Sequence, residues 1–444
     1  MKNKYVIVIS FDAVSEEDLE FLSKQPNFSK LIKNGALIKN VESVYPSLTY
    51  PAHATIVTGK YPKNHGVINN TVLDFKNDNP DWYWYRKYIK GDTIFDLAEK
   101  SGMKTCSILW PVTARSKITY NMPEIFCTKR YDNQILKSAL AGSKIYQVNM
   151  NKKFGYLRQG MEEPYLDNFA TEVAKKTIRE LKPNLILLHL IDSDSQKHKY
   201  GIENKEVIES LKRHDERLGE IIESLKLAGI YEDSTIIALG DHSQINVNNV
   251  IKLNSILMKN DLINVNGNKI KSYKAIAKSC DGSSYIYLKN KNDVETRKKV
   301  RDILNELKNK YSNVIEEVYN NEEIKNLGAD INASFMIEAK RGYYFIDDFL
   351  GEAIEVIDES SKIKHKLRAS HGYLPSRDNY KTFFIAYGKT IKKGVVLEKG
   401  KLINHGPTIA KILDIDLRDC DGIVWECFLH QKWFGILPLL LCGL

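Results

Sequence analysis

Acidic and imidazole side chains come at the ends of three apolar runs in this sequence. Asp12 ends the first run, Asp192 and Asp194 come at the end of the second, and Asp241 with His242 come at the end of the third. Carboxylate oxygens combined with imidazole nitrogens, without thiolates, suit zinc or a related divalent ion. The carboxyl ends of strands meet at one edge of an open α/β sheet, where such folds bind ligands. The pattern therefore predicts that separate strands deliver metal ligands to one place.

Two further positions extend this candidate ligand set. Asp194 and His198 lie four residues apart in IDSDSQKHKYG, so one helical turn would bring both to the same metal. His371 in SHGYLP is the remaining candidate, and Gly372 beside it permits close approach of the backbone. A single Asp at a strand end is more often a turn or capping residue, and a single His is more often structural. Their joint occurrence is what indicates a metal site.

Thr49 is the candidate nucleophile. It lies in YPSLTYPAHATIVTGKYPKNHG, in a proline-flanked turn before a helix-like run. The free N–H groups and the dipole at a helix N-terminus favour an anion such as phosphate. For an isolated threonine, capping the helix is the simpler role. A nearby divalent metal favours the catalytic role, because metal coordination activates hydroxyl nucleophiles near neutral pH.

The elements that must position these residues alternate between two patterns. Near-continuous Ile, Val and Leu, typical of parallel strands covered on both faces, occurs at 5–12, 105–110, 184–192, 234–241 and 381–388. Apolar residues at helical spacing occur at 167–182 and 204–229. The alternation predicts an α/β fold in which a mostly parallel central sheet lies between helix layers.

The pattern changes in the middle of the chain. Residues 250–345 are rich in Asn and Lys, with a hairpin-like strand at 283–290 and a long helix at 294–312. We predict an inserted α+β cap subdomain there. The predicted domains are a catalytic core in two parts, the cap and an apolar C-terminal tail, at 1–249, 250–345, 346–426 and 427–444.

Composition narrows the classes of function. The formal net charge is +9, but the cations are spread among many acids without a long basic run, so nucleic-acid binding is not expected. The six Cys form no CxxC pair, and the N-terminus reads as a strand and not as a signal peptide, which together favour a cytoplasmic protein. The apolar tail is well below the ~20 residues of a transmembrane helix. Nothing in the sequence indicates the oligomeric state.

Five ordered motifs carry a resemblance to a known family. They are FDA (11–13), PSLTYPAHATIVTGKYPKNHGVINN (46–70), DSDSQKHKYG (192–201), GDHSQ (240–244) and HGY (371–373). In this order and spacing they resemble the nucleotide pyrophosphatase/phosphodiesterase branch of the alkaline phosphatase superfamily. The resemblance extends from residue 5 to about residue 422 and implies an alkaline phosphatase-like fold.

The resemblance also implies roles for individual residues. Two zinc ions would be held, one by Asp12, Thr49, Asp241 and His242, and the other by Asp194, His198 and His371. Thr49 would form a covalent phospho-threonine intermediate in the hydrolysis of a small phosphorylated substrate such as a nucleotide. Asn70 would donate a hydrogen bond to a phosphoryl oxygen, and Tyr50 would stack on a nucleobase or leaving group. A turn role for Asn70 and core packing for Tyr50 are the alternatives.

Two departures from the family pattern leave the specificity open. Ser243 stands where many relatives carry Gly, and WPVTARSK (110–117) differs from the Gly-containing segment of nucleotide-specific members. Hydrolysis of phosphomonoesters or of phosphonates such as phosphonoacetate is an alternative on the same site. A catalytically silent binding protein of the same fold is a second alternative. The presence of all seven candidate ligands argues against it.

Overall fold

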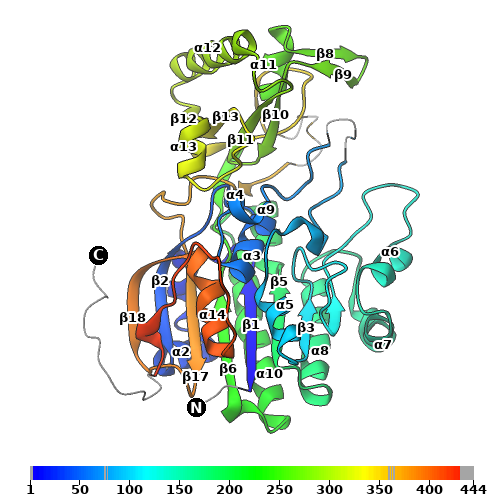
Figure 1. The fold of residues 1–444 in the computed structure, drawn as a ribbon, viewed down its shortest axis with the longest axis vertical. Coiled ribbons are helices and arrows are strands. Elements are labelled where there is room, and N and C mark those ends of the chain that lie inside the picture. The colour runs from blue at the N-terminus through cyan, green and yellow to red at the C-terminus, as the bar shows by residue number, and fades with distance from the viewer. Residues whose placement is uncertain are drawn as a thin grey trace.

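An eight-stranded sheet organises most of the chain (Figure 1). The computed structural model describes residues 4–74, 77, 79–358, 361, 363 and 366–430. In spatial order the strands are β18 (Val395–Lys401), β2 (Ala36–Glu42), β17 (Thr382–Gly388), β6 (Ser234–Leu239), β1 (Tyr5–Phe11), β5 (Leu185–Leu190), β3 (Thr105–Ile108) and β4 (Tyr120–Met122).

The sheet is mostly parallel, as predicted. β1 lies at its centre and pairs in parallel with β5 and β6. The run 381–388 is a correction: it forms β17, which runs antiparallel to both β6 and β2. An apolar run indicates a strand that is buried on both faces. A central antiparallel strand is buried in the same way, so the run does not reveal the direction of the strand. β2, β18 and β4 were not predicted, because their sequences mix apolar and polar residues.

Two helix layers cover the sheet, and alternate residues of β1 face each of them. Val6 and Val8 contribute to one apolar core, and Ile7 and Ile9 to the other. The first core includes residues of α3 (Thr49–Thr58), α5 (Ile94–Lys100) and α14 (His405–Leu413). The second includes residues of α1 (Glu16–Leu22), α2 (Pro26–Asn34), α7 (Lys144–Phe154), α8 (Tyr165–Glu180) and α10 (Lys205–Leu227). The predicted α/β architecture is therefore confirmed.

A second, antiparallel sheet lies beyond the end of the first sheet at which α3, α4 (Pro62–His65) and α9 (Asp192–Tyr200) are found (Figure 1). Its order is β10 (Ala275–Cys280), β11 (Ser283–Leu288), β13 (Phe335–Ala339) and β12 (Ile315–Asn320). With it go α11 (Leu253–Lys259), α12 (Val294–Lys310), α13 (Asn321–Asn326) and the hairpin of β8 (Ile263–Asn266) and β9 (Lys269–Tyr273). These elements lie within the region predicted as the cap.

A third, small sheet forms around β7 (Ile245–Ile251). Its other strands are β14 (Gly342–Phe345), β15 (Ile354–Val356) and β16 (Ala369–Ser370). The domain boundary predicted after residue 249 falls inside β7 and stays a prediction. Most of the predicted apolar tail, from residue 431 on, lies outside the described residues. Among the described helices, none combines the length and apolar character needed to cross a membrane.

Candidate two-metal active site

The first candidate metal site forms where β1, β6 and α3 meet. Asp12 follows the last residue of β1, and Asp241 and His242 follow β6. The His242 Nε2 atom lies 3.4 Å from Asp12 Oδ1, 3.3 Å from Asp241 Oδ2 and 3.1 Å from Thr49 Oγ1. Tetrahedral zinc with bonds of about 2.0–2.1 Å spaces its ligand atoms about 3.3 Å apart. The three oxygen atoms therefore each lie from His242 Nε2 at about the distance that separates two ligands of one zinc ion.

Close backbone contacts hold these strand ends in place. The Ala13 N–H donates to Asp241 Oδ1 at 3.1 Å, and the Ser43 hydroxyl donates to the Asp241 carbonyl at 2.6 Å. Gly240 permits the approach, because a Cβ there would lie 1.9 Å from Thr382 Oγ1 and 2.3 Å from the Val14 carbonyl oxygen. Asp241 is thus fixed by its Oδ1 and its main chain, which leaves Oδ2 for the shared site.

Thr49 is the first residue of α3 and does not cap the helix. Leu48 occupies the N-cap position, without a side-chain capping bond. The Thr49 hydroxyl instead contacts His242 Nε2, and its side chain is nearly buried. His53, one turn further on, contacts the Thr49 carbonyl oxygen through Nδ1 at 2.8 Å. The structure therefore places this hydroxyl beside the candidate ligand His242 and not on the free N–H groups of the helix.

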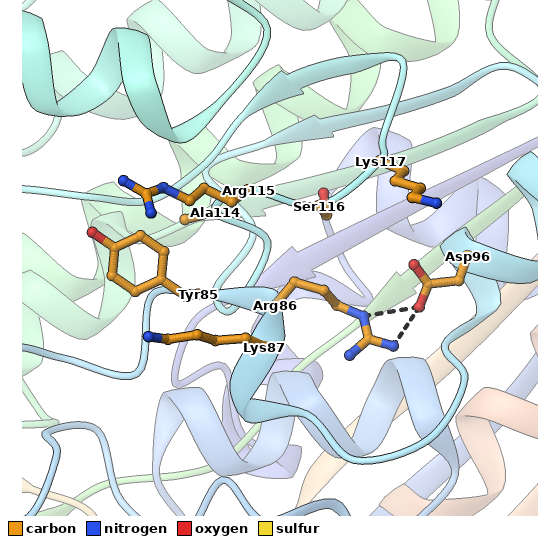
Figure 2. A pocket seen from close by; sticks show the side chains of 8 residues that line it. All are labelled: Tyr85, Arg86, Lys87, Asp96, Ala114, Arg115, Ser116 and Lys117. Atoms are coloured by element: carbon orange, nitrogen blue, oxygen red, sulfur yellow. Dashed lines mark hydrogen bonds and ion pairs between the residues drawn. The ribbon is translucent and has the colours of Figure 1, made fainter.

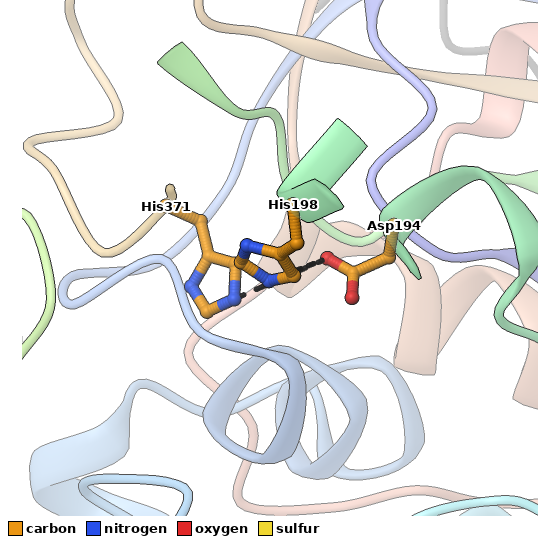
Figure 3. Close-up of side chains that lie close together, drawn as sticks. All are labelled: Asp194, His198 and His371. Atoms are coloured by element: carbon orange, nitrogen blue, oxygen red, sulfur yellow. Dashed lines mark ion pairs between the residues drawn. The ribbon is translucent and has the colours of Figure 1, made fainter. Parts of the chain in front are cut away.

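The second candidate site is built by α9 and the loop after β16. His198 Nε2 lies 3.3 Å and His371 Nε2 4.0 Å from Asp194 Oδ1, and Figure 3 shows both imidazoles close to this carboxylate. His198 Nδ1 lies 2.7 Å from the Ala369 carbonyl oxygen, which leaves Nε2 for a metal. The segment 192–200 is helical, so Asp194 and His198 lie one helical turn apart, as the sequence predicts.

The two sites adjoin each other. The His242 and His371 rings are 4.4 Å apart between centroids, and those of His198 and His371 are 5.0 Å apart. Asp12 Oδ1 and Asp241 Oδ2 are buried without a hydrogen-bond partner among the described residues. Burial, together with the negative charges of Asp241 and Asp194, raises the pKa of Asp12 well above its usual value. Buried, unpartnered carboxylates beside imidazoles fit a divalent cation at each site.

Two of the three candidate ligands of the second site, His371 and Asp194, are in the ionisation state that binds a metal. Burial alone would lower the pKa of the third, His198, but Asp194 raises it overall to about 9. Burial and the neighbouring His242 and His198 lower the pKa of His371 well below its usual value, which keeps its imidazole neutral. Burial alone would raise the pKa of Asp194, but His198 and His371 lower it overall. A neutral imidazole and an ionised carboxylate are the forms in which these side chains bind metals.

Asn70 lies beside the candidate nucleophile. Its Oδ1 accepts a 2.9 Å hydrogen bond from the Tyr50 N–H, the amide that follows Thr49. Tyr50 itself is a correction. Its ring is fully buried and makes an edge contact with Trp82, with centroids 5.3 Å apart. Burial in the first core leaves no ring face for a nucleobase in this structure.

Several polar residues around the sites were missed from the sequence. His189, in β5, contacts Asp12 Oδ2 through Nε2 at 3.0 Å and lies 3.7 Å from Glu124 through Nδ1. Gln244 donates to Asp194 Oδ1, and Asp281 lies beside His371. A histidine inside an apolar run carries no sequence signal for such a role. Asp281 is far from His371 along the chain, so the sequence around it also gives no signal for such a role.

Asp192 does not join either metal site, although it follows the same strand as Asp194. Its carboxylate accepts hydrogen bonds from Arg213 at 2.7 and 2.9 Å and from Arg217 at 2.8 Å. The buried Asp167 and the partly buried Glu163 complete an acidic group at this place. The two arginines neutralise Asp192, so its role is structural.

A basic depression of about 320 Å³ lies elsewhere on the surface (Figure 2). It is lined by Tyr85, Arg86, Lys87, Asp96, Ala114, Arg115, Ser116 and Lys117. Arg86 is paired with Asp96, and the Arg115 guanidinium lies 5.2 Å from the centre of the Tyr85 ring. None of the candidate metal ligands lines it. Its second half comes from 110–117, the segment that departs from nucleotide-specific members of the family.

Comparison with known proteins identifies the family. The family described as type I phosphodiesterase / nucleotide pyrophosphatase matches residues 6–374. Human ectonucleotide pyrophosphatase/phosphodiesterase family member 1 is 29% identical over 228 residues, which are 49% of this chain and 21% of that protein. Human bis(5'-adenosyl)-triphosphatase ENPP4 is 24% identical over 451 residues, 98% of this chain and 83% of that protein. The chain thus spans about a fifth of the length of the first of these relatives.

Solved structures support the fold. Murine ectonucleotide pyrophosphatase / phosphodiesterase 5, in complex with AMP, superposes with a TM-score of 0.67 at 18% identity, covering 97% of this chain and 100% of that chain. The human protein of the same name gives a TM-score of 0.66 at 18% identity, covering 96% of this chain and 100% of that chain. The predicted alkaline phosphatase-like fold is confirmed. The chain belongs to the type I phosphodiesterase / nucleotide pyrophosphatase family.

Proposed function

We propose that the chain is a two-zinc hydrolase of small phosphate diesters or pyrophosphates such as nucleotides, acting through a phospho-threonine on Thr49. The observation that carries this proposal is the convergence of Asp12, Asp241, His242 and the Thr49 hydroxyl, with donor atoms 3.1–3.4 Å from His242 Nε2. Asp194, His198 and His371 would hold the second ion. One relative is named an ectonucleotide pyrophosphatase/phosphodiesterase and the other a bis(5'-adenosyl)-triphosphatase, which supports the choice of substrate class.

The chain's own residues would perform the remaining work. When bound, the two ions would supply positive charge toward the phosphoryl oxygens and lower the pKa of the attacking hydroxyl. Thr49 Oγ1, after losing its proton to solvent, would attack phosphorus as the bond to the leaving group breaks, which gives a phospho-threonine that keeps the other ester substituent. Water would then cleave the bond between Thr49 Oγ1 and phosphorus, which restores the hydroxyl and releases a phosphate monoester. The side-chain oxygen of Asn70 accepts from the Tyr50 N–H. Its side-chain nitrogen makes no hydrogen bond with the described residues. That nitrogen is the group to donate to a phosphoryl oxygen.

The decisive experiment compares wild type with Thr49→Ala and Thr49→Ser. Bis(p-nitrophenyl) phosphate, p-nitrophenyl phosphate and phosphonoacetate serve as diester, monoester and phosphonate substrates. We expect diester hydrolysis to be fastest, Thr49→Ala to lose nearly all of it, and Thr49→Ser to keep part because a hydroxyl remains. Zinc content, measured by elemental analysis, should stay largely unchanged in both variants.

A matched control lies on the same helix. Thr58 is also a buried threonine of α3, but its hydroxyl donates to the Ala54 carbonyl at 2.7 Å. Thr58→Ala should keep both the activity and the zinc. Wild-type turnover in Thr49→Ala would remove Thr49 from its role. Preferred turnover of the monoester or of phosphonoacetate would replace the diester proposal by that reaction, and no turnover with bound zinc would favour the silent binding protein.

A further inference from the structure

The turn between β10 and β11 is in direct contact with the candidate metal ligand His371. The Gly282 N–H in this turn donates to the His371 carbonyl oxygen at 2.8 Å. At the next residue, Gly372 has φ +82°, and a Cβ there would lie 1.8 Å from the Cys280 carbonyl oxygen. The main chain around His371 is therefore pressed against a turn of the antiparallel sheet.

The same turn places a carboxylate on the inner nitrogen of His371. Asp281 Oδ2 lies 3.5 Å from His371 Nδ1, while His371 Nε2 faces Asp194 Oδ1 at 4.0 Å. His371 Nδ1 is buried and has no hydrogen-bond partner among the described residues. A histidine that binds a metal through Nε2 carries its proton on Nδ1, and an acceptor there fixes both the tautomer and the ring orientation.

We infer that Asp281 is a positioning residue that holds the His371 imidazole, through Nδ1, in the orientation and tautomer in which Nε2 binds the second metal. The inference rests on the proposed function, in which His371 is a ligand. His198 needs no such side chain, because the Ala369 carbonyl lies at its Nδ1. The second site would thus depend on one residue from the antiparallel sheet.

The backbone of Asp281 is consistent with a functional role. It has φ +60°, a left-handed conformation that glycine adopts without strain and other residues adopt at a cost. A turn chosen only for its shape would be better served by glycine at this position. The carboxylate is the part of Asp281 that glycine could not supply.

This conformation provides a variant that separates positioning from folding. Asp281→Gly relieves the backbone strain but removes the carboxylate, so the stability of the metal-free protein in EDTA should stay equal or rise. Zinc affinity of the second site, measured by competition with a chromogenic chelator, should fall about 10- to 100-fold, the usual effect of losing such a partner. The first zinc should bind as in wild type. Asp281→Asn keeps an acceptor oxygen and should lose less than tenfold.

Asp261 offers the matched control. It also lies in the region predicted as the cap with φ +61°, but it touches neither metal site. Asp261→Gly should leave both zinc affinities unchanged. Hydrolysis of bis(p-nitrophenyl) phosphate by Asp281→Gly should be low at limiting zinc and recover in excess zinc.

His371→Ala distinguishes a failure of this inference from a failure of the proposed site. If His371→Ala loses the second zinc while Asp281→Gly binds it with wild-type affinity, Asp281 has no positioning role and the ligand set stands. If His371→Ala binds both ions as wild type does, the ligand set itself is wrong. A parallel loss of zinc affinity and of metal-free stability in Asp281→Gly would also overturn the inference, because it would indicate a structural role.

Discussion

Neutralising Asp241 should stabilise the metal-free protein and destabilise it relative to wild type once zinc is present. The candidate ligand atoms of Asp12, Asp241 and His242 all lie within 4.8 Å of one another. Two carboxylate charges 4.8 Å apart repel by about 3.5 kcal/mol at an effective dielectric constant of about 20. Asp241→Asn removes this repulsion, and its Oδ1 can still accept from the Ala13 N–H. Because protonation of Asp12 already relieves part of the repulsion, we expect a gain of about 2–3 kcal/mol.

The expected shifts follow from the size of the chain. With about 2.1 cal/mol/K of unfolding entropy per residue over 444 residues, 1 kcal/mol corresponds to about 1 °C in Tm. Asp241→Asn should therefore melt about 2–3 °C higher than wild type in EDTA. Zinc at about 1,000 times its dissociation constant adds about 4 kcal/mol per site, hence about 4 °C. Because the variant loses one such increment, it should melt about 1–2 °C below wild type in zinc.

Differential scanning calorimetry in EDTA and in zinc would measure this crossing. Asp192→Asn is the control, because Asp192 is a buried strand-end aspartate whose charge is compensated by Arg213 and Arg217. It should be destabilised in both conditions, since breaking a buried ion pair typically costs about 3–5 kcal/mol. A lower Tm for Asp241→Asn in EDTA, or an unchanged response to zinc, would refute the reasoning.

Two further predictions concern substrate contact and pH. Asn70→Ala should lower kcat about 10²-fold or more in steady-state assays, because a donor to the phosphoryl oxygen is lost, and should leave zinc content unchanged; wild-type kcat would exclude that role. Burial lowers the pKa of His65, His214 and His405 to about 3, 3 and 4, well below the unfolded value near 6.5. These neutral histidines therefore contribute stability that is complete above about pH 6.5 and is lost as the pH falls, because the unfolded chain then binds more protons. In EDTA, the difference in Tm between wild type and His405→Gln should therefore become less favourable to wild type between pH 7.5 and 5, and a difference that does not change with pH would contradict this.

The candidate ligands could be predicted because their chemistry is local. Asp12, Asp241 and His242 each come at the end of a strand, and Asp194 with His198 needs only one turn of α9. The position of a residue relative to an apolar run is therefore enough to predict that its side chain lies at the carboxyl edge of the sheet. The two neighbouring clusters follow from the parallel pairing of β1 with β6 and β5. The apolar runs indicated parallel strands but not their order.

The remaining features depend on long-range packing. The direction of β17 is set by the chain's return from the antiparallel sheet, and its apolar sequence is compatible with either direction. Tyr50 was expected at the substrate, but its ring is buried against Trp82 in the core. His189 and Asp281 act through partners on other elements, and neither has a neighbour in sequence that would mark it.

The position of β17 has a consequence for the order in which the protein folds during its synthesis. Among the described strands, β2 pairs only with β17 and β18, and both are translated more than 300 residues after it. β1, β5 and β6 can pair with one another as soon as they have left the ribosome. The backbone N–H and C=O groups of β2 stay unpaired until β17 and β18 are synthesised. β17 then enters between β6 and β2 and completes the sheet in one late step. A ribosome stalled before residue 382 should therefore hold a chain with an exposed sheet edge, which is the species that a chaperone would bind.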